Sequence, residues 1–465
     1  MDGGRTRGRV RIQIGKVYMQ EIREEQIKSA YLVGLRTGQS EERFFGSMEE
    51  LKSLAQAAGY EVLAIYTQNQ PEIHKATYIG EGKVREVAEG LGSLPADAVI
   101  FDDTLSPMQI RNLGKELETV ILDRTGLILE IFSERARTRE AKLQVESAQL
   151  QYLLPRLAGM RQNLDRQGGN SGSRSSRGAG EKQIELDRRH IEHRISVLRR
   201  ELVQVRRERE TQRSRRLGNG EFRVALVGYT NAGKSTLLNL LLQSFRKDRA
   251  EDKSVLEKDM LFATLDTTIR RIEPPGMQAF LLSDTVGFIS ELPTTLVDAF
   301  RSTLEEAVYA DLLLQVVDYS DEDHAFQEEV TRETLREIGA GAIPCITVYN
   351  KMDKYEAAQR AGRSADEQVL LFPEYPSARA DKVYVTLKGE HAQESVRLLL
   401  EQIDHMRSQG EEEHTYRFPY DKTAELHAMK RLGQVLSERY EADGTEVKMR
   451  VRPAVGKAYA AYEVT

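Results

Sequence analysis

The chain has 465 residues, one cysteine, Cys345, and a formal net charge of −6. Single hydrophobic cores rarely exceed about 250 residues, so we expect about three domains. One cysteine excludes a disulfide framework, and no apolar run approaches the roughly 18 residues of a membrane span. Because Met1 to Gly15 lack the apolar centre of a secretory leader, we expect a cytoplasmic protein without a membrane segment, monomeric when free.

Residues 28–132, which follow a polar extension of residues 1–27, alternate between apolar stretches and amphipathic ones. Helices between successive strands favour a small parallel sheet covered on both faces. The sequence therefore predicts an N-terminal α/β subdomain. Its expected strands are 30–35, 62–66, 98–101 and 120–122, and its expected helices are 48–58, about 80–91 and one that begins at Ser106.

Residues 133–217 show two heptad stripes of similar length, which predict an antiparallel helical hairpin. The stretch between the stripes, 158–183, is rich in glycine, serine and arginine and cannot bury a core, so we expect a loop at the tip of the hairpin. The stripes are Leu143, Ser147, Leu150, Leu154 and Leu157, followed by Ile191, Ile195, Leu198, Leu202 and Val205.

The hairpin concentrates positive charge. Residues 156–216 hold about 17 Lys and Arg against about 8 Asp and Glu. Guanidinium groups bind phosphates in a fork and stack on bases, which suits contact with folded RNA. The alternative is an ordinary solvated helix face. The candidates for RNA contact are Arg161, Arg166, Arg174, Arg177, Lys182, Arg188 and Arg189.

Residues 219–405 open with an apolar strand, a glycine-rich turn and an apolar helix, which is the context of a phosphate-binding loop. Lys234 would supply positive charge to the β- and γ-phosphates during catalysis, and Ser235 would ligate Mg²⁺. The predicted nucleotide contacts in this loop are Gly228, Tyr229, Thr230, Asn231, Ala232, Gly233, Lys234, Ser235 and Thr236.

Two further segments extend the predicted phosphate site. Asp284, Thr285, Val286 and Gly287 follow an apolar strand; the aspartate would hold Mg²⁺ through water, and the N–H of Gly287, a catalytic candidate, would face the γ-phosphate. Phe288 cannot orient an attacking water, so we expect slow intrinsic hydrolysis.

The segment Phe262, Ala263, Thr264, Leu265 and Asp266 lies between the phosphate loop and Asp284. Thr264 is a catalytic and Mg²⁺-ligand candidate in a nucleotide-dependent switch. The alternative is a short strand that exposes Thr264. A helix over Leu296 to Tyr309, directly after the Asp284 segment, would receive movement around the γ-phosphate.

Base selection is predicted at Asn350, Lys351, Met352 and Asp353, after a strand over 343–349. A carboxylate at Asp353 accepts hydrogen bonds from N1–H and N2–H₂ of guanine, which adenine does not offer. Asn350 would tie this segment to the phosphate loop, and the Lys351 stem would cover the purine.

Residues 414–465 are predicted to form a small α/β domain, with a helix from Lys422 to about Leu436 and a strand over 446–451.

With these motifs in place, the chain resembles the HflX family of ribosome-associated GTPases from about residue 28 to the C-terminus. The most specific matches lie outside the general nucleotide motifs. They are 101–103 with 105–107, 123–126 with 131–132, 136–145, 153–157, 185–189 and 262–266. The resemblance implies a multidomain α/β protein: a parallel α/β subdomain, the hairpin, a P-loop GTPase domain of the TRAFAC class and a C-terminal domain.

The same resemblance implies binding to the large ribosomal subunit and its rRNA, with the hairpin loop near the peptidyl-transferase region and dissociation of stalled or idle ribosomes. Hydrolysis would then be stimulated by the ribosome. Some members of the family are associated with resistance to drugs of that region, and the tip here, 168–185, is longer than usual. Val385 stands where a serine normally begins the last guanine-contacting turn, Val385, Thr386 and Leu387. The alternatives are a GTP-switched RNA-binding adaptor and an ATP-using RNA remodeller.

Overall fold

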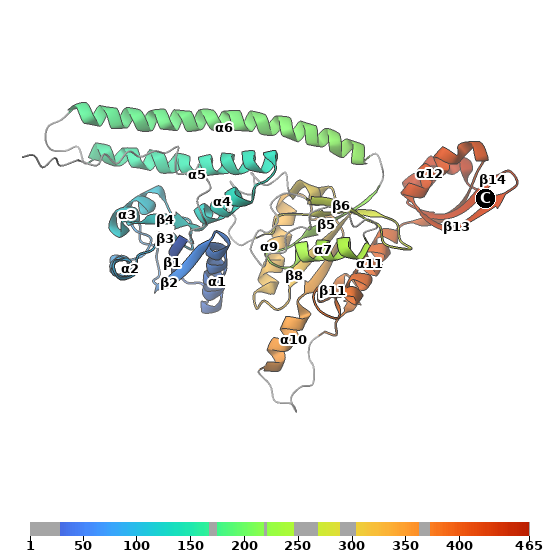
Figure 1. The fold of residues 1–465 in the computed structure, drawn as a ribbon, viewed down its shortest axis with the longest axis horizontal. Coiled ribbons are helices and arrows are strands. Elements are labelled where there is room, and N and C mark those ends of the chain that lie inside the picture. The colour runs from blue at the N-terminus through green and yellow to red at the C-terminus, as the bar shows by residue number, and fades with distance from the viewer. Residues whose placement is uncertain are drawn as a thin grey trace, which may run out of the picture.

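The computed structural model describes residues 28–166, 174–217, 221–245, 268–288, 304–361 and 373–464. Its strands form three sheets, of four, seven and three strands, that follow one another along the chain. Figure 1 shows the two long helices α5 and α6 lying side by side above the first sheet, with α6 reaching over toward the second. The expected multidomain α/β fold class is confirmed. Among the described helices, none is long and apolar enough to cross a bilayer.

The first sheet has the order β2-β1-β3-β4, with every neighbouring pair parallel. Helices α1 and α4 cover one face, where Leu32 packs, and α2 and α3 cover the other, where Tyr31 and Val33 pack. The predicted parallel sheet with two covered faces is therefore confirmed. The elements are β1 (Lys28–Arg36), α1 (Glu41–Ala57), β2 (Tyr60–Asn69), α2 (Glu81–Ser93), β3 (Ala98–Phe101), α3 (Pro107–Leu117), β4 (Val120–Asp123) and α4 (Arg124–Arg135).

Helix α4 has no counterpart among the predicted elements. Its N-cap is Asp123, whose side chain accepts a hydrogen bond from the N–H of Gly126. All six residues from Arg124 to Leu129 are buried in succession, so this part of the helix lacks the one-sided apolar period by which an amphipathic helix is recognised. Helix α1 also begins about two turns earlier than predicted, at Glu41, because Ser40 caps it by accepting the N–H of Arg43.

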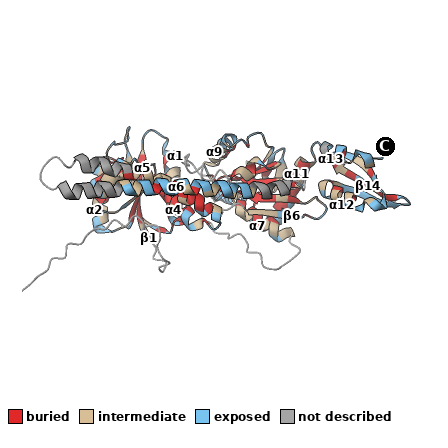
Figure 2. Ribbon diagram, turned by 90° about the horizontal axis from the view of Figure 1, so that it is seen from above, coloured by how far each residue is buried: buried red, intermediate tan, exposed pale blue. Residues whose placement is uncertain are grey.

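The predicted hairpin consists of α5 (Arg139–Arg166) and α6 (Arg174–Leu217) and is called the arm below. The loop expected over 158–183 is wrong in its bounds, because both helices continue into this range and leave only 167–173 between them, outside the described residues. Leu157 packs against Ile191 and Ile195. The ion pair between Arg209 and Glu140 lies farther from the tip on both helices, which fixes the antiparallel sense. Figure 2 shows pale blue, exposed residues along much of α6, whereas α5 is buried both against α6 and, through Ala141, Val145 and Ala148, against the N-terminal subdomain.

The base of the arm is tied to the next sheet unit by ion pairs. Arg209 in α6 pairs with Glu140 in α5 at 3.2 Å and with Glu306 at 3.4 Å. Arg206 pairs with Glu305 at 3.0 Å. Because residues 304–308 are helical and lie beside β8, these contacts join α6 to the second sheet unit. Most of the predicted helix over 296–309 lies outside the described residues.

The second sheet has the order β10-β11-β9-β8-β5-β7-β6, with a parallel centre and antiparallel edge strands β10 and β6. Its central strands are buried, and α7, α9 and α11 surround them (Figure 1). The elements are β5 (Phe222–Val227), α7 (Lys234–Phe245), β6 (Thr268–Ile272), β7 (Phe280–Asp284), β8 (Leu312–Asp318), α9 (His324–Glu337), β9 (Cys345–Asn350), α10 (Met352–Ala361), β10 (Ser377–Arg379), β11 (Lys382–Tyr384) and α11 (Ala392–Ser408).

The third sheet has the order β12-β14-β13, with antiparallel pairs. Its elements are β12 (Glu412–Phe418), α12 (Thr423–Leu432), β13 (Gln434–Glu441) and β14 (Gly444–Val451). The expected helix up to about Leu436 is wrong, because α12 stops at Leu432 and β13 begins two residues later. A Cβ at Gly433 would lie 2.4 Å from a methyl group of Val451 and 2.8 Å from the carbonyl oxygen of Arg450, so the chain turns where only glycine fits.

Candidate functional site

The glycine-rich turn between β5 and α7 has the backbone shape of a phosphate-binding loop. Gly228 and Gly233 have φ angles of 139° and 106°, which disfavour residues with a Cβ. A Cβ on Gly228 would also lie 2.2 Å from the carbonyl oxygen of Val316, and one on Gly233 2.3 Å from the side-chain nitrogen of Asn350. The loop therefore depends on both glycines, and α7 begins at Lys234 with its N-terminal N–H groups available to an anion.

Lys234 is buried at the start of α7. Its ammonium group donates to the carbonyl oxygens of Gly228 at 2.9 Å and Tyr229 at 2.7 Å. Burial lowers the pKa of Lys234 to about 8, opposed by the negative charge of Asp284. A polyphosphate would supply the negative charge that this buried ammonium group needs.

Ser235 and Asp284 come together although 49 positions separate them in the sequence. The Ser235 hydroxyl donates to Oδ2 of Asp284 at 3.0 Å, and Asp284 is fully buried at the end of β7. A hydroxyl and a carboxylate are the hard oxygen ligands that Mg²⁺ prefers, so this pair fits the ion. The third predicted element of the Mg²⁺ site, Thr264, lies outside the described residues with Phe262, Ala263, Leu265 and Asp266.

The segment that follows Asp284 lies directly against the phosphate loop. The N–H of Phe288 donates to the Gly228 carbonyl at 3.1 Å, and the N–H of Thr230 donates to the Phe288 carbonyl at 2.8 Å. A Cβ on Gly287 would lie 2.9 Å from Cα of Thr230 and 3.0 Å from Nζ of Lys234. Phe288 itself is 1% exposed and belongs to the core cluster that also includes α1 and α4, so its ring faces this core.

The predicted base-selecting segment follows β9. The side-chain amide of Asn350 donates to the carbonyl of Ala232 at 2.9 Å, so the predicted tie to the phosphate loop is confirmed. The carboxylate of Asp353 accepts a hydrogen bond from the Thr386 hydroxyl at 2.8 Å. Val385 is buried and donates its N–H to the carbonyl of Tyr349 at 2.8 Å. These contacts bring the Asn350–Asp353 and Val385–Leu387 turns together beside the phosphate loop.

Lys351 has a partner that the sequence did not indicate. Its ammonium group lies 2.6 Å from Oδ2 of Asp318, at the end of β8, and its φ angle is 64°. No spacing rule links the two residues, because only the parallel pairing of β8 and β9 brings these strand ends together. Asp318 therefore orients the lysine that we expected to cover the purine.

The candidates for RNA contact lie on or near the arm, and the structure describes the side chains of two of them. Arg188 and Arg189 both pair with Glu185, at 3.2 Å and 3.1 Å, and Arg188 also pairs with Glu192. Exposed pairs of this kind contribute little to stability, so they open at low cost when phosphate competes. The side chains of the remaining candidates lie outside the described residues: Arg161, Arg166, Arg174, Arg177 and Lys182.

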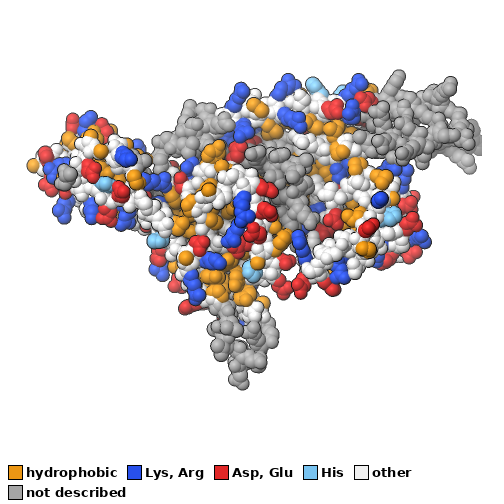
Figure 3. Space-filling view, turned by 180° about the vertical axis from the view of Figure 1, so that it is seen from behind, with side chains coloured by type: hydrophobic (Ala, Val, Ile, Leu, Met, Phe, Trp, Pro, Cys, Tyr) orange, Lys and Arg blue, Asp and Glu red, His pale blue; other side chains and the backbone are white. Residues whose placement is uncertain are grey.

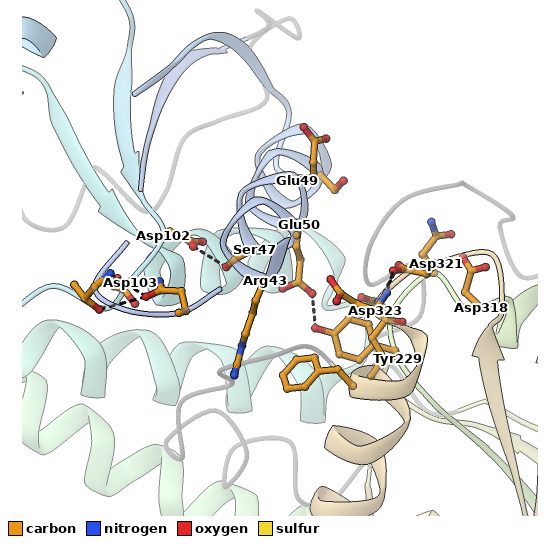
Figure 4. Close-up of a pocket in the computed structure, with 18 of the residues that line it drawn as sticks. Arg43, Ser47, Glu49, Glu50, Asp102, Asp103, Tyr229, Asp318, Asp321 and Asp323 are labelled. Carbon is orange, nitrogen blue, oxygen red and sulfur yellow. Dashed lines mark hydrogen bonds between the residues drawn. The ribbon is translucent and has the colours of Figure 1, made fainter. Parts of the chain in front are cut away.

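A cavity of about 500 Å³ separates the N-terminal subdomain from the back of the phosphate loop. Helix α1 lines one side, and Tyr229 to Asn231 with the start of α9 line the other (Figure 4). Acidic side chains, among them Asp102 and Asp323, dominate the lining. No pattern in the sequence places α1 beside the nucleotide loop.

The pKa of Lys234 predicts proton uptake on nucleotide binding. Phosphate favours the ammonium form, so the pKa of Lys234 rises from about 8 when GDP binds. In the nucleotide-free protein, Lys234 is neutral in roughly 0.1 of the molecules at pH 7 and in roughly 0.5 at pH 8. We therefore expect each molecule to take up about these numbers of protons when it binds GDP. The measurement is the dependence of the titration enthalpy of GDP on the ionisation enthalpy of the buffer. Equal uptake at the two pH values would contradict the assignment.

A glycine-dependent phosphate loop, a buried lysine, a Ser–Asp pair and a tethered Asn-Lys-x-Asp turn on a mostly parallel sheet together define a P-loop GTPase. Three family descriptions match consecutive parts of the chain: "GTP-binding GTPase N-terminal" over residues 46–133, "GTP-binding GTPase Middle Region" over 135–216 and "50S ribosome-binding GTPase" over 223–351. The chain belongs to the GTPase HflX family and is a GTP-hydrolysing enzyme.

Two relatives named GTPase HflX match over nearly their whole lengths. The protein of Lacrimispora saccharolytica is 42% identical over 436 residues, which cover 94% of this chain and 95% of that one. The protein of Caldanaerobacter subterraneus is 40% identical over 443 residues, which cover 95% of each chain. Among solved structures, a GTP-binding protein from Sulfolobus solfataricus in complex with GDP is 25% identical, with a TM-score of 0.41 over 82% of this chain and 99% of that one.

Proposed function

We propose that this GTPase binds the large ribosomal subunit, docks its arm into rRNA and dissociates stalled or idle ribosomes. The observation that carries the proposal is the arm itself. Helix α5 packs on the N-terminal subdomain and on α6, and exposed arginines lie along much of α6 (Figure 3). Among them are Arg189, Arg194, Arg199, Arg200, Arg206 and Arg207.

The charge distribution supports RNA as the partner. The chain is acidic overall, with a formal net charge of −6, but on the arm Lys and Arg outnumber Asp and Glu. Binding to a phosphate backbone depends on such local charge and not on the net charge of the protein. Membership of a family whose nucleotide domain is described as ribosome-binding points to rRNA among RNA targets.

The nucleotide site supports slow hydrolysis by the free protein. We propose that Ser235, Asp284 and Thr264 hold Mg²⁺, which would neutralise phosphate charge, and that Lys234 stabilises the transition state. Phe288 offers no polar group to an attacking water, and its backbone is bonded to the phosphate loop. A ribosome that rearranged this segment would stimulate hydrolysis, by at least about tenfold in single-turnover rate. Equal rates with and without large subunits would contradict this part of the proposal.

The decisive experiment is sedimentation of intact ribosomes with the full chain and a non-hydrolysable GTP analogue. We expect free subunits, with the protein in the large-subunit fraction, and intact ribosomes when GDP replaces the analogue. Deletion of residues 168–180 should abolish both association and splitting. Reversal of charge at Arg188 and Arg189 should weaken association, whereas Arg397→Glu, on the exposed face of α11, should leave it unchanged.

The runner-up is a GTP-switched RNA-binding adaptor, which would bind RNA through the same arm but leave ribosomes intact in this experiment. Use of ATP by an RNA remodeller would appear as efficient competition of ATP against labelled GTP. If the arm reaches the peptidyl-transferase region, it also competes with drugs bound there, so we propose to compare drug sensitivity with and without expression of the protein.

A further inference from the structure

A hydrogen bond joins the phosphate loop to the N-terminal subdomain. The hydroxyl of Tyr229 donates to Oε1 of Glu50 at 2.6 Å, across 179 positions of sequence (Figure 4). Tyr229 is the second residue of the phosphate loop and is 7% exposed, and Glu50 lies on α1. A bond between a hydroxyl and a carboxylate at this distance is charge-assisted and among the stronger ones in proteins.

Glu50 is itself held in place by a buried ion-pair network. Arg124, at the start of α4, is 2% exposed and pairs with both Glu50 and Asp102. Asp102 also accepts a hydrogen bond from the Ser47 hydroxyl at 2.6 Å. Because these groups lie on α1, α4 and the end of β3, the position of the Glu50 carboxylate is set by the core of the N-terminal subdomain.

The other end of Tyr229 holds the lysine of the site. Its carbonyl oxygen accepts the ammonium group of Lys234 at 2.7 Å. We infer that Glu50 is a positioning residue for GTP hydrolysis, which acts through Tyr229 to fix the ammonium group of Lys234 where the phosphates bind. The N-terminal subdomain thereby supplies a part of the nucleotide site that the GTPase domain lacks on its own.

The physical basis is preorganisation. A donor that stabilises the transition-state charge is effective only if it does not have to be reoriented during the reaction. The Tyr229 carbonyl stays in place because its own ring is tethered, so Lys234 remains directed at the phosphates. Without the tether, water reaches the loop and the ammonium group samples several positions, which costs more in the transition state than in the bound ground state.

The test compares Tyr229→Phe, Glu50→Gln and the double variant in the full chain, in the absence of ribosomes. Tyr229→Phe keeps the ring in the core and removes only the hydroxyl. We expect kcat for intrinsic GTP hydrolysis to fall about tenfold, with less than about a threefold change in the Kd of GDP. The double variant should be no slower than the slower single variant, because both substitutions break the same link. Glu49→Gln, the neighbouring carboxylate on α1, is the matched control and should behave as the unmodified protein.

Two readouts separate positioning from a merely structural role. The first is rescue by the conservative variant: Glu50→Asp keeps a carboxylate and should recover part of the kcat that Glu50→Gln loses, whereas the Kd of GDP should stay within about threefold in all variants. The second is thermal unfolding, which measures the folded fraction. Unchanged kcat in Tyr229→Phe, additive losses in the double variant, or a loss of activity that only follows the folded fraction would each overturn the inference.

Discussion

Asp353→Asn is expected to lower the affinity for GTP and GDP by at least about 100-fold and to create affinity for xanthosine nucleotides. The carboxylate accepts from N1–H and N2–H₂ of guanine, whereas an amide presents an N–H₂ group to the N2–H₂ donor and leaves both unsatisfied. Xanthine carries an oxygen at that position and accepts from the amide instead. The Thr386 hydroxyl, 2.8 Å from Oδ1, holds the side chain at position 353 in place for either base. Competition of unlabelled nucleotides against a fluorescent GDP measures both effects.

The matched control for this change is Glu394→Gln, the same replacement of a carboxylate on the exposed surface of α11, which should leave both affinities unaltered. If Asp353→Asn kept its preference for GDP over xanthosine diphosphate, base recognition would have to be assigned to another group. If it lost binding of both nucleotides, circular dichroism of the variant would show whether α10 had unfolded.

Lys234→Met is expected to reduce the rate of GTP hydrolysis by at least about 1,000-fold, because no other described cation contacts the loop carbonyls where the phosphates bind. The same change should not lower the melting temperature of the nucleotide-free protein. Burial of the ammonium group, with its pKa lowered from 10.5 to about 8, costs the fold on the order of 3 kcal/mol, and methionine avoids this cost at the loss of two hydrogen bonds.

For Lys234 the dependence of stability on pH has a definite sign. The unfolded chain binds more protons than the native state between about pH 8 and 10.5, so this residue makes the free energy of unfolding rise with pH across that window. The rise should be absent in Lys234→Met and present in Lys52→Met, a half-exposed control on α1. Denaturant titrations at pH 7.5, 8.5 and 9.5 measure it, and parallel curves for the two variants would refute the assignment.

Local sequence patterns were sufficient to predict the elements that depend only on residues close together in the chain. The phosphate loop, the N-cap at Ser106 and the heptad stripes each follow from residue types at fixed spacing, and the described structure contains all three. Helix α4 could not be predicted, because the burial of Arg124 to Leu129 in succession removes the amphipathic period. The end of α12 was misplaced because the need for Gly433 arises from β14, a strand that follows it in the chain.

The nucleotide site likewise contains contacts that a sequence motif specifies and contacts that arise only from packing. The tie from Asn350 to Ala232 was predictable, because the motif itself specifies the partner. Asp318 and Glu50 were not, since each reaches its partner only through packing: Asp318 through the pairing of β8 with β9, and Glu50 through the contact of two subdomains. Acidic residues on a helix surface carry no sequence signal of such a role, and only the buried Arg124 beside Glu50 distinguishes it from Glu49.

The continuity of α6 has a mechanical consequence. The helix spans 44 residues, and ion pairs of Arg206 and Arg209 with Glu305 and Glu306 join its foot to the nucleotide unit, so a movement of that unit would be passed along the helix. At a rise of 1.5 Å per residue the helix is roughly 66 Å long, so a tilt of about 10° at its foot would sweep the far end through about 11 Å. Small rearrangements beside the γ-phosphate would therefore displace the far end of the arm by about the length of one or two nucleotides.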